Sequence, residues 1–266
     1  MGSIGFVPTM GALHEGHLSL VAESNKTCKT TVVSIYLNPT QFAQGEDLDS
    51  YPQKLQVDLN KLSEYEVDCV FTPNNSEMYP EGFKTNNYSN NLFTLLEGKN
   101  RPEFFKGVTT IVAKLFDIVE PTHAYFGEKD FQQLCIIKNM VKDLNYPVQV
   151  VPCPIIREKN GLAMSSRNVY LTKSEHDIAA TINHALERGK NLLQLGERSS
   201  YLIKDKITKS IAAEKLFRVD YVSVADSITL AEISGFIKKD ILVSTAVFLS
   251  GTRLIDNFSY SISSSK

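Results

Sequence analysis

Over its first 150 residues the chain alternates short β-branched runs with longer stretches of helical periodicity, and this alternation constrains the fold most. Strands joined by crossover helices form a parallel sheet. The pattern predicts about five strands, at Ile4 to Pro8, Thr30 to Leu37, Asp68 to Thr72, Ala124 to Phe126 and Val148 to Val151. It predicts helices at His17 to Cys28, Pro52 to Ser63, Gly107 to Val119 and Phe131 to Leu144. We therefore expect an α/β fold with a doubly wound parallel sheet.

The chain changes character after Pro152 and Pro154. Thr172 to Leu195 is predicted as one long helix, opened by a capping box in which Thr172 and Glu175 satisfy backbone amides. Later strand-like stretches have fewer helices between them: Val219 to Val224, Ile241 to Phe248 and Arg253 to Asn257. We expect a first domain over residues 1–155 and a smaller α+β domain over residues 156–266.

Two segments are predicted to lie outside regular structure. Residues 73–100 are polar and contain seven asparagines, which is typical of a long surface loop or lid. The serine-rich tail from Ser259 to Lys266 is expected to fray.

Composition excludes several classes of function. Lys and Arg number 28 and Asp and Glu number 30, a net charge of −2, so no basic excess attracts nucleic acid. No apolar run approaches the roughly 18 residues that cross a bilayer, and nothing before Ile4 resembles a signal peptide. We expect a cytosolic chain with no membrane or nucleic-acid partner. Four cysteines follow no Cys-x-x-Cys pattern and are expected to be reduced packing residues: Cys28, Cys69, Cys135 and Cys153.

Residues 8–17, PTMGALHEGH, carry the strongest chemical signal because they leave the first strand and open the first helix. Ligands of open α/β sheets bind at this edge, where a helix N-terminus offers amides and a positive dipole to an anion. His14 and His17 can donate hydrogen bonds to phosphate oxygens there, and Gly16 lets the backbone approach closely. A zinc-protease helix has its histidines four residues apart, whereas these are three apart, so we assign no metal ligand.

Further polar segments accompany this motif. Residues 161–168, GLAMSSRN, offer two hydroxyls and a guanidinium that match phosphate oxygens. Lys129 and Gln133 follow the predicted strand that ends at Phe126, and Gln41 follows the second strand. Taken singly, each segment is also compatible with an ordinary polar loop. Class I aminoacyl-tRNA synthetases and their nucleotidyl-transferring relatives pair a histidine motif with a serine-rich motif around ATP, so the pairing is the informative feature.

Six ordered motifs, PTMGALHEGH, SIYLNPTQF, EDLDSYPQKL, YFGEKDFQQL, GLAMSSRNVYL and GTRLIDN, together resemble the pantothenate synthetase family over nearly the whole chain. The resemblance implies a cytosolic homodimer that joins (R)-pantoate and β-alanine with ATP and Mg²⁺. It also implies a Rossmann-like first domain and a smaller C-terminal lid domain.

The resemblance also implies roles for individual residues. His17 corresponds to the family's proton donor and His14 to its partner at the phosphates, and both are grouped with Lys129, Ser165, Ser166 and Arg167 as catalytic. Gln41 and Gln133 correspond to the pantoate-binding amides. The expected nucleotide-binding residues are Met10, Gly11, Ala12, Leu13, His14, Glu15, Gly16, His17, Gly127, Glu128, Lys129, Asp130, Ile156, Met164, Ser165, Ser166 and Arg167.

Three positions depart from the family pattern. The resemblance offers Asp58 as a magnesium ligand, but its neighbour Val57 stands where many relatives carry a second acid, so metal ligation is left unassigned. Phe104 replaces the family's usual histidine, and Thr40 stands where methionine is common.

Two other functions are compatible with these residues. One is a nucleotidyltransferase that stops after pyrophosphate is lost. The other is a nucleotide-binding regulator without turnover.

Overall fold

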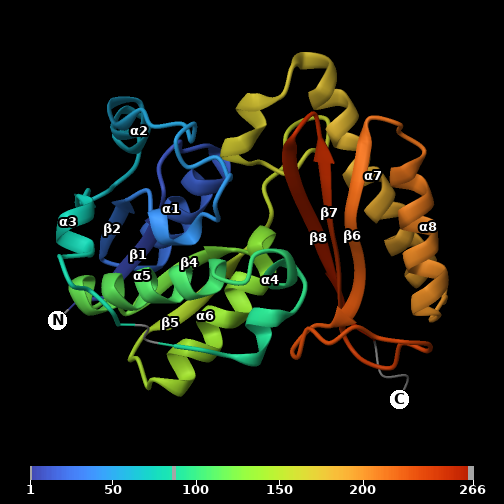
Figure 1. The fold of residues 1–266 in the computed structure, drawn as a ribbon. Helices are drawn as coiled ribbons and strands as arrows, with labels where there is room; N and C mark the ends of the chain where they lie inside the picture. The colour runs from blue at the N-terminus through green and yellow to red at the C-terminus, as the bar shows by residue number, and fades with distance from the viewer. Residues whose placement is uncertain (1, 86–87, 263–266) are drawn as a thin grey trace. The chain divides into compact units, whose positions relative to one another are not determined.

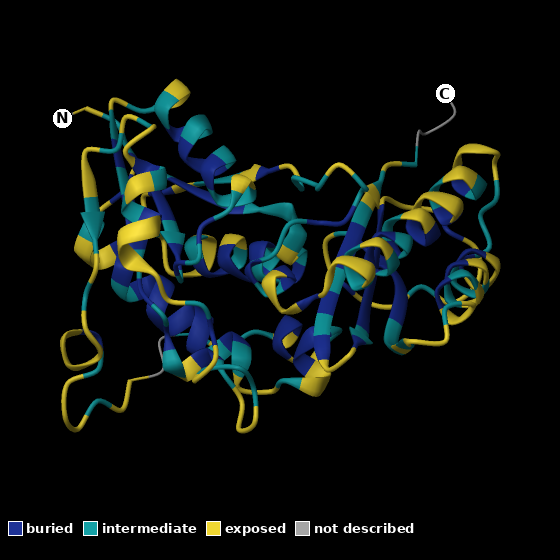
Figure 2. Cartoon of the chain, turned by 90° about the horizontal axis from the view of Figure 1, so that it is seen from above, coloured by how far each residue is buried: buried dark blue, intermediate teal, exposed yellow. Residues whose placement is uncertain are grey.

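The structure is a computed structural model that describes residues 2–85 and 88–262. It divides into two compact units, Met1–Ile156 and Arg157–Lys266, one residue after the expected boundary (Figure 1). Each unit has a hydrophobic core of its own, and in each the helices bury one side and expose the other (Figure 2).

The first unit is built on a five-stranded parallel sheet in the order β3-β2-β1-β4-β5. Its strands are β1 (Ile4–Thr9), β2 (Thr30–Ile35), β3 (Cys69–Phe71), β4 (His123–Gly127) and β5 (Gln149–Cys153). From β1 the chain winds outward to β3, then returns to the other side of β1 with β4, so the winding direction reverses between β1 and β4. This confirms the doubly wound sheet, and the reversal places its ligand-binding edge after β1 and β4.

Side chains that alternate along the strands separate the two faces of this sheet. Phe6 of β1 belongs to a core with α5 (Phe104–Val119) and α6 (Phe131–Asp143). Val7 belongs to a different core, with residues of α1 (Glu15–Thr27) and α2 (Leu55–Leu62). Helices therefore cover both faces, as the nearly continuous apolar strands require.

The expectation of a surface loop over residues 73–100 is wrong for much of the segment that is described. It contains α3 (Asn75–Met78), a 3₁₀ turn η2 (Asn91–Thr94) and α4 (Glu97–Asn100), and buries Met78, Leu92 and Phe93. The Gln132 side chain of α6 binds the backbone of Leu92, Leu95 and Glu97 and so holds this segment. Residues 86 and 87 lie outside the described part.

The second unit packs two helices on a three-stranded antiparallel sheet of order β6-β7-β8. Its elements are α7 (Lys173–Gln194), α8 (Ser200–Ala212), β6 (Phe217–Asp226), β7 (Ile241–Leu249) and β8 (Thr252–Tyr260). The capping box of Thr172 and Glu175 is confirmed at the start of α7, whereas α8 was not expected. Of the serine-rich tail, Ser259 and Tyr260 belong to β8, and residues 263–266 lie outside the described part.

Two expectations from composition can be compared with the described residues. No helix among them is both long and apolar enough to cross a membrane. All four cysteines are free thiols, but Cys69 is exposed, so its expected packing role is wrong.

Candidate active site

The loop between β1 and α1 makes a tight turn that is held by a carboxylate from α2. Gly11 and Ala12 both have positive φ, +84° and +50°. Asp58, buried in α2, accepts the Ala12 amide at 2.9 Å and the Leu13 amide at 2.8 Å. A Cβ on Gly11 would lie 3.1 Å from Asp58 Oδ2, so glycine lets the loop pass this close. The turn therefore fixes where α1 begins.

His14 and His17 stack at the N-terminus of α1, with ring centroids 4.1 Å apart. The Gly16 amide donates to His14 Nδ1 at 3.1 Å, and the His14 amide donates to His17 Nδ1 at 3.4 Å. Because each Nδ1 accepts a backbone N–H, the proton of each neutral imidazole lies on Nε2. Both rings therefore keep an Nε2–H donor for a ligand.

The electrostatic surroundings keep both rings neutral. Burial, then the neighbouring His17 ring and the Lys129 ammonium, lowers the pKa of His14 to about 2. Burial, then the Lys129 and Lys61 ammonium groups, lowers the pKa of His17 to about 4. The structure thus brings together the histidine motif, Lys61 of α2, and Lys129 from the 3₁₀ turn η3 (Glu128–Asp130) that follows β4. Positive charge around two neutral donors favours an anionic ligand.

The loop after β2 presents Gln41 toward this region from the 3₁₀ turn η1 (Pro39–Gln41). Buried Asn38 caps the turn, and its Nδ2 donates to Gln41 Oε1 at 3.0 Å. This bond fixes the orientation of the Gln41 amide, so that Nε2 reaches Met10 Sδ at 3.1 Å. A thioether is a weak acceptor, so a substrate oxygen would accept the Nε2–H hydrogen bond more strongly than the Met10 sulfur does.

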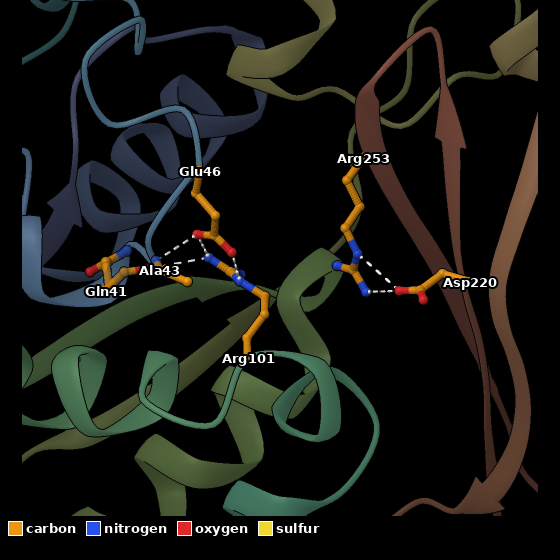
Figure 3. A network of polar contacts seen from close by, with 6 residues as sticks. All are labelled: Gln41, Ala43, Glu46, Arg101, Asp220 and Arg253. Carbon is orange, nitrogen blue, oxygen red and sulfur yellow. Dashed lines mark hydrogen bonds and ion pairs between the residues drawn. The ribbon is translucent and has the colours of Figure 1, made fainter.

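Arg101 holds the main chain of this loop (Figure 3). Its guanidinium forms two bonds of 2.6 and 2.7 Å to Glu46 and donates to Gln41 O at 3.2 Å. Phe104 lies 3.7 Å beneath the guanidinium. The phenylalanine at the family's histidine position thus supports Arg101 by a cation–π contact.

The remaining expected residues of the first unit follow β4, begin α1 or end the unit. Gly127, Glu128 and Lys129 are partly buried, and Asp130 is exposed. Gln133 lies in the first turn of α6 and is also partly buried. Glu15 is exposed at the start of α1, and Ile156 is the last residue of the unit.

The serine and arginine motif belongs to the second unit. Met164 and Ser165 are partly buried, Ser166 is buried, and Ser165 Oγ caps the 3₁₀ turn η4 (Ser166–Tyr170) by accepting the Arg167 amide. In the same unit, Arg253 pairs with Asp220 at 2.7 Å (Figure 3).

No three His, Cys, Asp or Glu side chains among the described residues gather in a way that would hold a metal ion. Both carboxylate oxygens of Asp58 accept backbone amides. Asp58 is thus used to hold the turn before α1, and we assign no metal ligand.

Sequence reasoning missed three residues that shape the site. Asn38 sets the Gln41 amide, and its Oδ1 accepts the Thr40 hydroxyl at 3.0 Å and the Tyr79 hydroxyl at 2.8 Å. Asp58 was considered as a metal ligand, although it holds the turn before α1. The available signal for Asn38 was its place before proline, because Asn-Pro often starts a turn; Tyr79 offered none.

Comparison with known proteins decides the family. The family model for pantoate-beta-alanine ligase matches residues 1–259. The chain belongs to the pantoate-beta-alanine ligase family. Among its relatives, the pantothenate synthetase of Acetivibrio thermocellus is 50% identical over 96% of this chain and 90% of its own length. The pantothenate synthetase of Clostridium botulinum strain 657 is 46% identical, over 98% and 92%.

Solved structures of this family share the fold. Pantothenate synthetase from Thermus thermophilus superposes with a TM-score of 0.92 and 42% identity, over 96% of this chain and 92% of that one. A ligase from Francisella tularensis, complexed with beta-gamma ATP and beta-alanine, gives a TM-score of 0.77 and 34% identity over 97% and 89%. The ligase fold therefore extends through both units.

Proposed function

We propose that the chain catalyses the ATP-dependent ligation of (R)-pantoate and β-alanine to pantothenate, releasing AMP and pyrophosphate. The observation that carries the proposal is the stacked pair of neutral imidazoles at the edge of the sheet that follows β1 and β4. Their Nε2–H donors, the amides at the start of α1 and the Lys129 ammonium together favour a polyphosphate.

The first step activates the acid. A carboxylate is a poor acyl donor because its leaving group would be oxide. A carboxylate oxygen of pantoate therefore attacks the α-phosphorus of ATP, pyrophosphate leaves, and pantoyl adenylate forms. His14 and His17 donate Nε2–H to phosphate oxygens as their charge grows, and Lys129 neutralises that charge. As neutral donors, the two rings need no change of protonation state for this role.

The second step forms the amide. The neutral amine of β-alanine attacks the acyl carbon of pantoyl adenylate, AMP leaves, and the nitrogen loses a proton. Gln41 and Gln133 orient pantoate, so the enzyme acts mainly by positioning and needs no covalent nucleophile. Gln41 suits this role because, among the described residues, the acceptor of its Nε2–H is the Met10 thioether, which is a weak one.

We further propose that the second unit contributes Ser165, Ser166 and Arg167 to the phosphates and serves as a lid, with Met164 and Ile156 beside the nucleotide. Hydroxyl and guanidinium donors suit phosphate oxygens, which supports this assignment. We propose that ATP is used together with Mg²⁺, which would neutralise charge on the phosphate oxygens; no residue of this chain is assigned as its ligand.

The test is AMP release measured with one substrate omitted at a time. We expect sustained AMP formation only when ATP, pantoate and β-alanine are all present, and at least about a hundredfold loss in His17→Ala. A dinucleotide product released without β-alanine would instead indicate a nucleotidyltransferase. ATP binding without turnover would indicate a regulator.

The resemblance also supports a homodimer in the cytosol. Sedimentation equilibrium should then give a mass near twice the 29.7 kDa of one chain. A mass of one chain at all concentrations would contradict the dimer.

A further inference from the structure

The carbonyl of Leu13 lies just before the first carbonyl that α1 uses. His14 O accepts the amides of His17 and Leu18, so the hydrogen bonds of the helix begin there. The Leu13 oxygen instead accepts from the Lys61 ammonium of α2, with Nζ at 2.5 Å. Leu13 is buried, and a buried carbonyl needs a donor. Lys61 therefore supplies a hydrogen bond that the helix does not.

The Leu13–His14 peptide links Lys61 to the His17 ring. This peptide bond is trans, so its C=O and N–H point in opposite directions from one rigid plane. The oxygen accepts from Lys61, and the N–H donates to His17 Nδ1 at 3.4 Å. A donor at the oxygen also polarises the amide and makes its N–H a better donor. Lys61 thus supports the bond that orients the His17 ring.

The same face of α2 holds the preceding backbone. Asp58 and Lys61 are three residues apart in this helix, so their side chains are neighbours. The Asp58 carboxylate accepts the Ala12 and Leu13 amides, and Lys61 donates to the Leu13 oxygen. Ala12 has a φ of +50°, which a residue with a Cβ keeps only when its surroundings hold it. Two opposite charges of α2 therefore hold the N–H and the C=O of Leu13.

The Lys61 ammonium could also act by its charge, and the two roles have different consequences. A carbonyl partner carries no formal charge, so this bond does not neutralise the ammonium. Burial, then the Lys129 ammonium and then the Lys61 ammonium, lowers the pKa of His17 to about 4. The ring is therefore neutral near pH 7 and has a single N–H, which lies on Nε2 as long as Nδ1 accepts the His14 amide.

We propose that Lys61 is a positioning residue for His17: through the Leu13–His14 peptide it keeps Nδ1 on its backbone donor and so keeps the Nε2–H donor in place. This inference rests on the proposed function of His17 at the phosphates. Without Lys61 the peptide can rotate, and the His17 ring loses its backbone partner. The Nε2–H donor is then placed less accurately when charge grows on the phosphate oxygens.

Three substitutions test the proposal. Lys61→Met keeps an unbranched side chain of good helix propensity but removes the donor and the charge. Lys61→Arg keeps a charged donor. The matched control is Lys54→Met, which removes a charge from an exposed residue at the start of the same helix that forms no side-chain capping bond. Urea unfolding of each variant establishes that it is folded.

The imidazole nitrogens report the positioning directly in ¹⁵N NMR at neutral pH without substrates. In Lys61→Met the His17 Nδ1 signal should move to that of a ring nitrogen without a donor, and in Lys61→Arg and Lys54→Met it should stay. His14 is the internal control, since the Gly16 amide donates to its Nδ1. An unchanged His17 signal in Lys61→Met, or a protonated His17 Nδ1 in the wild type, would overturn the proposal. Equal movement of both rings would show a merely structural role and overturn it too.

A double-mutant cycle measures the consequence for catalysis by AMP release. Lys61→Met should lower kcat about tenfold, the equivalent of one hydrogen bond, whereas Lys54→Met should leave it unchanged. In the His17→Ala background Lys61→Met should lower kcat by less than about twofold, because the ring through which Lys61 acts is absent. A full tenfold loss in that background would show that Lys61 acts by its charge on the phosphates, and would overturn the proposal.

The two measurements separate failure of this proposal from failure of the proposed function. The ring nitrogens are observed without substrates, so the spectrum decides whether Lys61 positions His17 even if no pantothenate forms. An unchanged spectrum in Lys61→Met together with normal ligase activity would leave the proposed function intact and remove Lys61 from it.

Discussion

Each histidine of the motif uses its two ring nitrogens differently. Nδ1 accepts a backbone amide at the start of α1, and Nε2 carries the proton of the neutral ring as a donor. Capping and ligand donation are therefore separate properties of one side chain. A suitable substitution removes the second and keeps the first.

His14→Asn separates the two roles. Asparagine is a good N-cap residue, so its Oδ1 can accept the Gly16 amide, but nothing replaces the Nε2 donor. We expect the free energy of unfolding to stay close to wild type and turnover to fall about a hundredfold. His14→Ala should lose the same turnover and about 1 kcal/mol of stability as well. Turnover near wild type in His14→Asn would remove His14 from the phosphate site.

The lowered pKa values also predict sensitivity to acid. The unfolded histidines have pKa values near 6.5, whereas those in the folded protein are about 2 for His14 and about 4 for His17. As the pH falls from about 6.5 toward about 4, the unfolded chain takes up protons that the folded chain does not, so the free energy of unfolding decreases. Urea unfolding at several pH values should show a smaller decrease in His14→Asn, because asparagine does not titrate. An equal decrease would contradict the lowered pKa of His14.

Adjacent glutamines of α6 should give opposite phenotypes. Gln133→Ala should raise the KM for pantoate with little change in ATP binding or stability. Gln132→Ala should lower the free energy of unfolding, because Gln132 binds the backbone at Leu92, Leu95 and Glu97. Initial rates and urea unfolding of both variants provide the comparison. An unchanged pantoate dependence in Gln133→Ala would contradict its assignment.

At the scale of elements, hydrophobic periodicity predicted the helices and strands that bury apolar side chains at regular intervals. It failed where a capping side chain sets the position at which a helix begins. α1 begins at Glu15, before the expected His17, because His14 serves as its cap and histidine is not among the preferred N-cap residues. The asparagines at 74 and 90 suggested a loop, yet they cap α3 and η2. Residue type alone cannot tell a loop asparagine from a capping asparagine, because either role depends on the local backbone geometry.

The missed helix α8 had a readable signal. Ile203, Ile207 and Ile211 recur every four residues and are fully buried, and Ser199 caps the helix. β-Branched residues reduce helix propensity, which weakens the local preference, so packing on the sheet decides the structure here.

The contact between α3 and the β2 loop gives a prediction at this scale. The hydroxyl of Tyr79, just after α3, donates a hydrogen bond to Asn38 Oδ1. Asn38 in turn orients Gln41 through its Nδ2. Tyr79→Phe should raise the KM for pantoate about threefold to tenfold, the equivalent of about 1 kcal/mol. Tyr36→Phe is the control, because the Tyr36 hydroxyl donates to Asn75 Oδ1 of α3. An equal rise in the KM for pantoate in both variants would show that Tyr79 acts only through stability.

At the scale of the whole molecule, alternation predicted a parallel sheet and a second α+β domain, but not the strand order. The order β3-β2-β1-β4-β5 depends on which face each helix covers, and this is a property of distant contacts. Yet the order explains why the motifs after β1 and β4 belong to one site, since the sheet reverses its winding between those strands. The sequence located the chemical groups, and the topology brings these two motifs together.

The assignment of ATP contacts to both units predicts a shared response to the nucleotide. A non-hydrolysable ATP analogue should slow amide hydrogen exchange at residues 11–18 and at residues 163–168. Ligand at 100 times its Kd adds about 2.7 kcal/mol to the opening free energy of any segment that must be closed to bind it. The exposed turn near Thr229 and Gly235 serves as an internal control, since no contact with the ligand is assigned there. Slowing confined to residues 11–18 would retain the histidine site and remove Ser165, Ser166 and Arg167 from it.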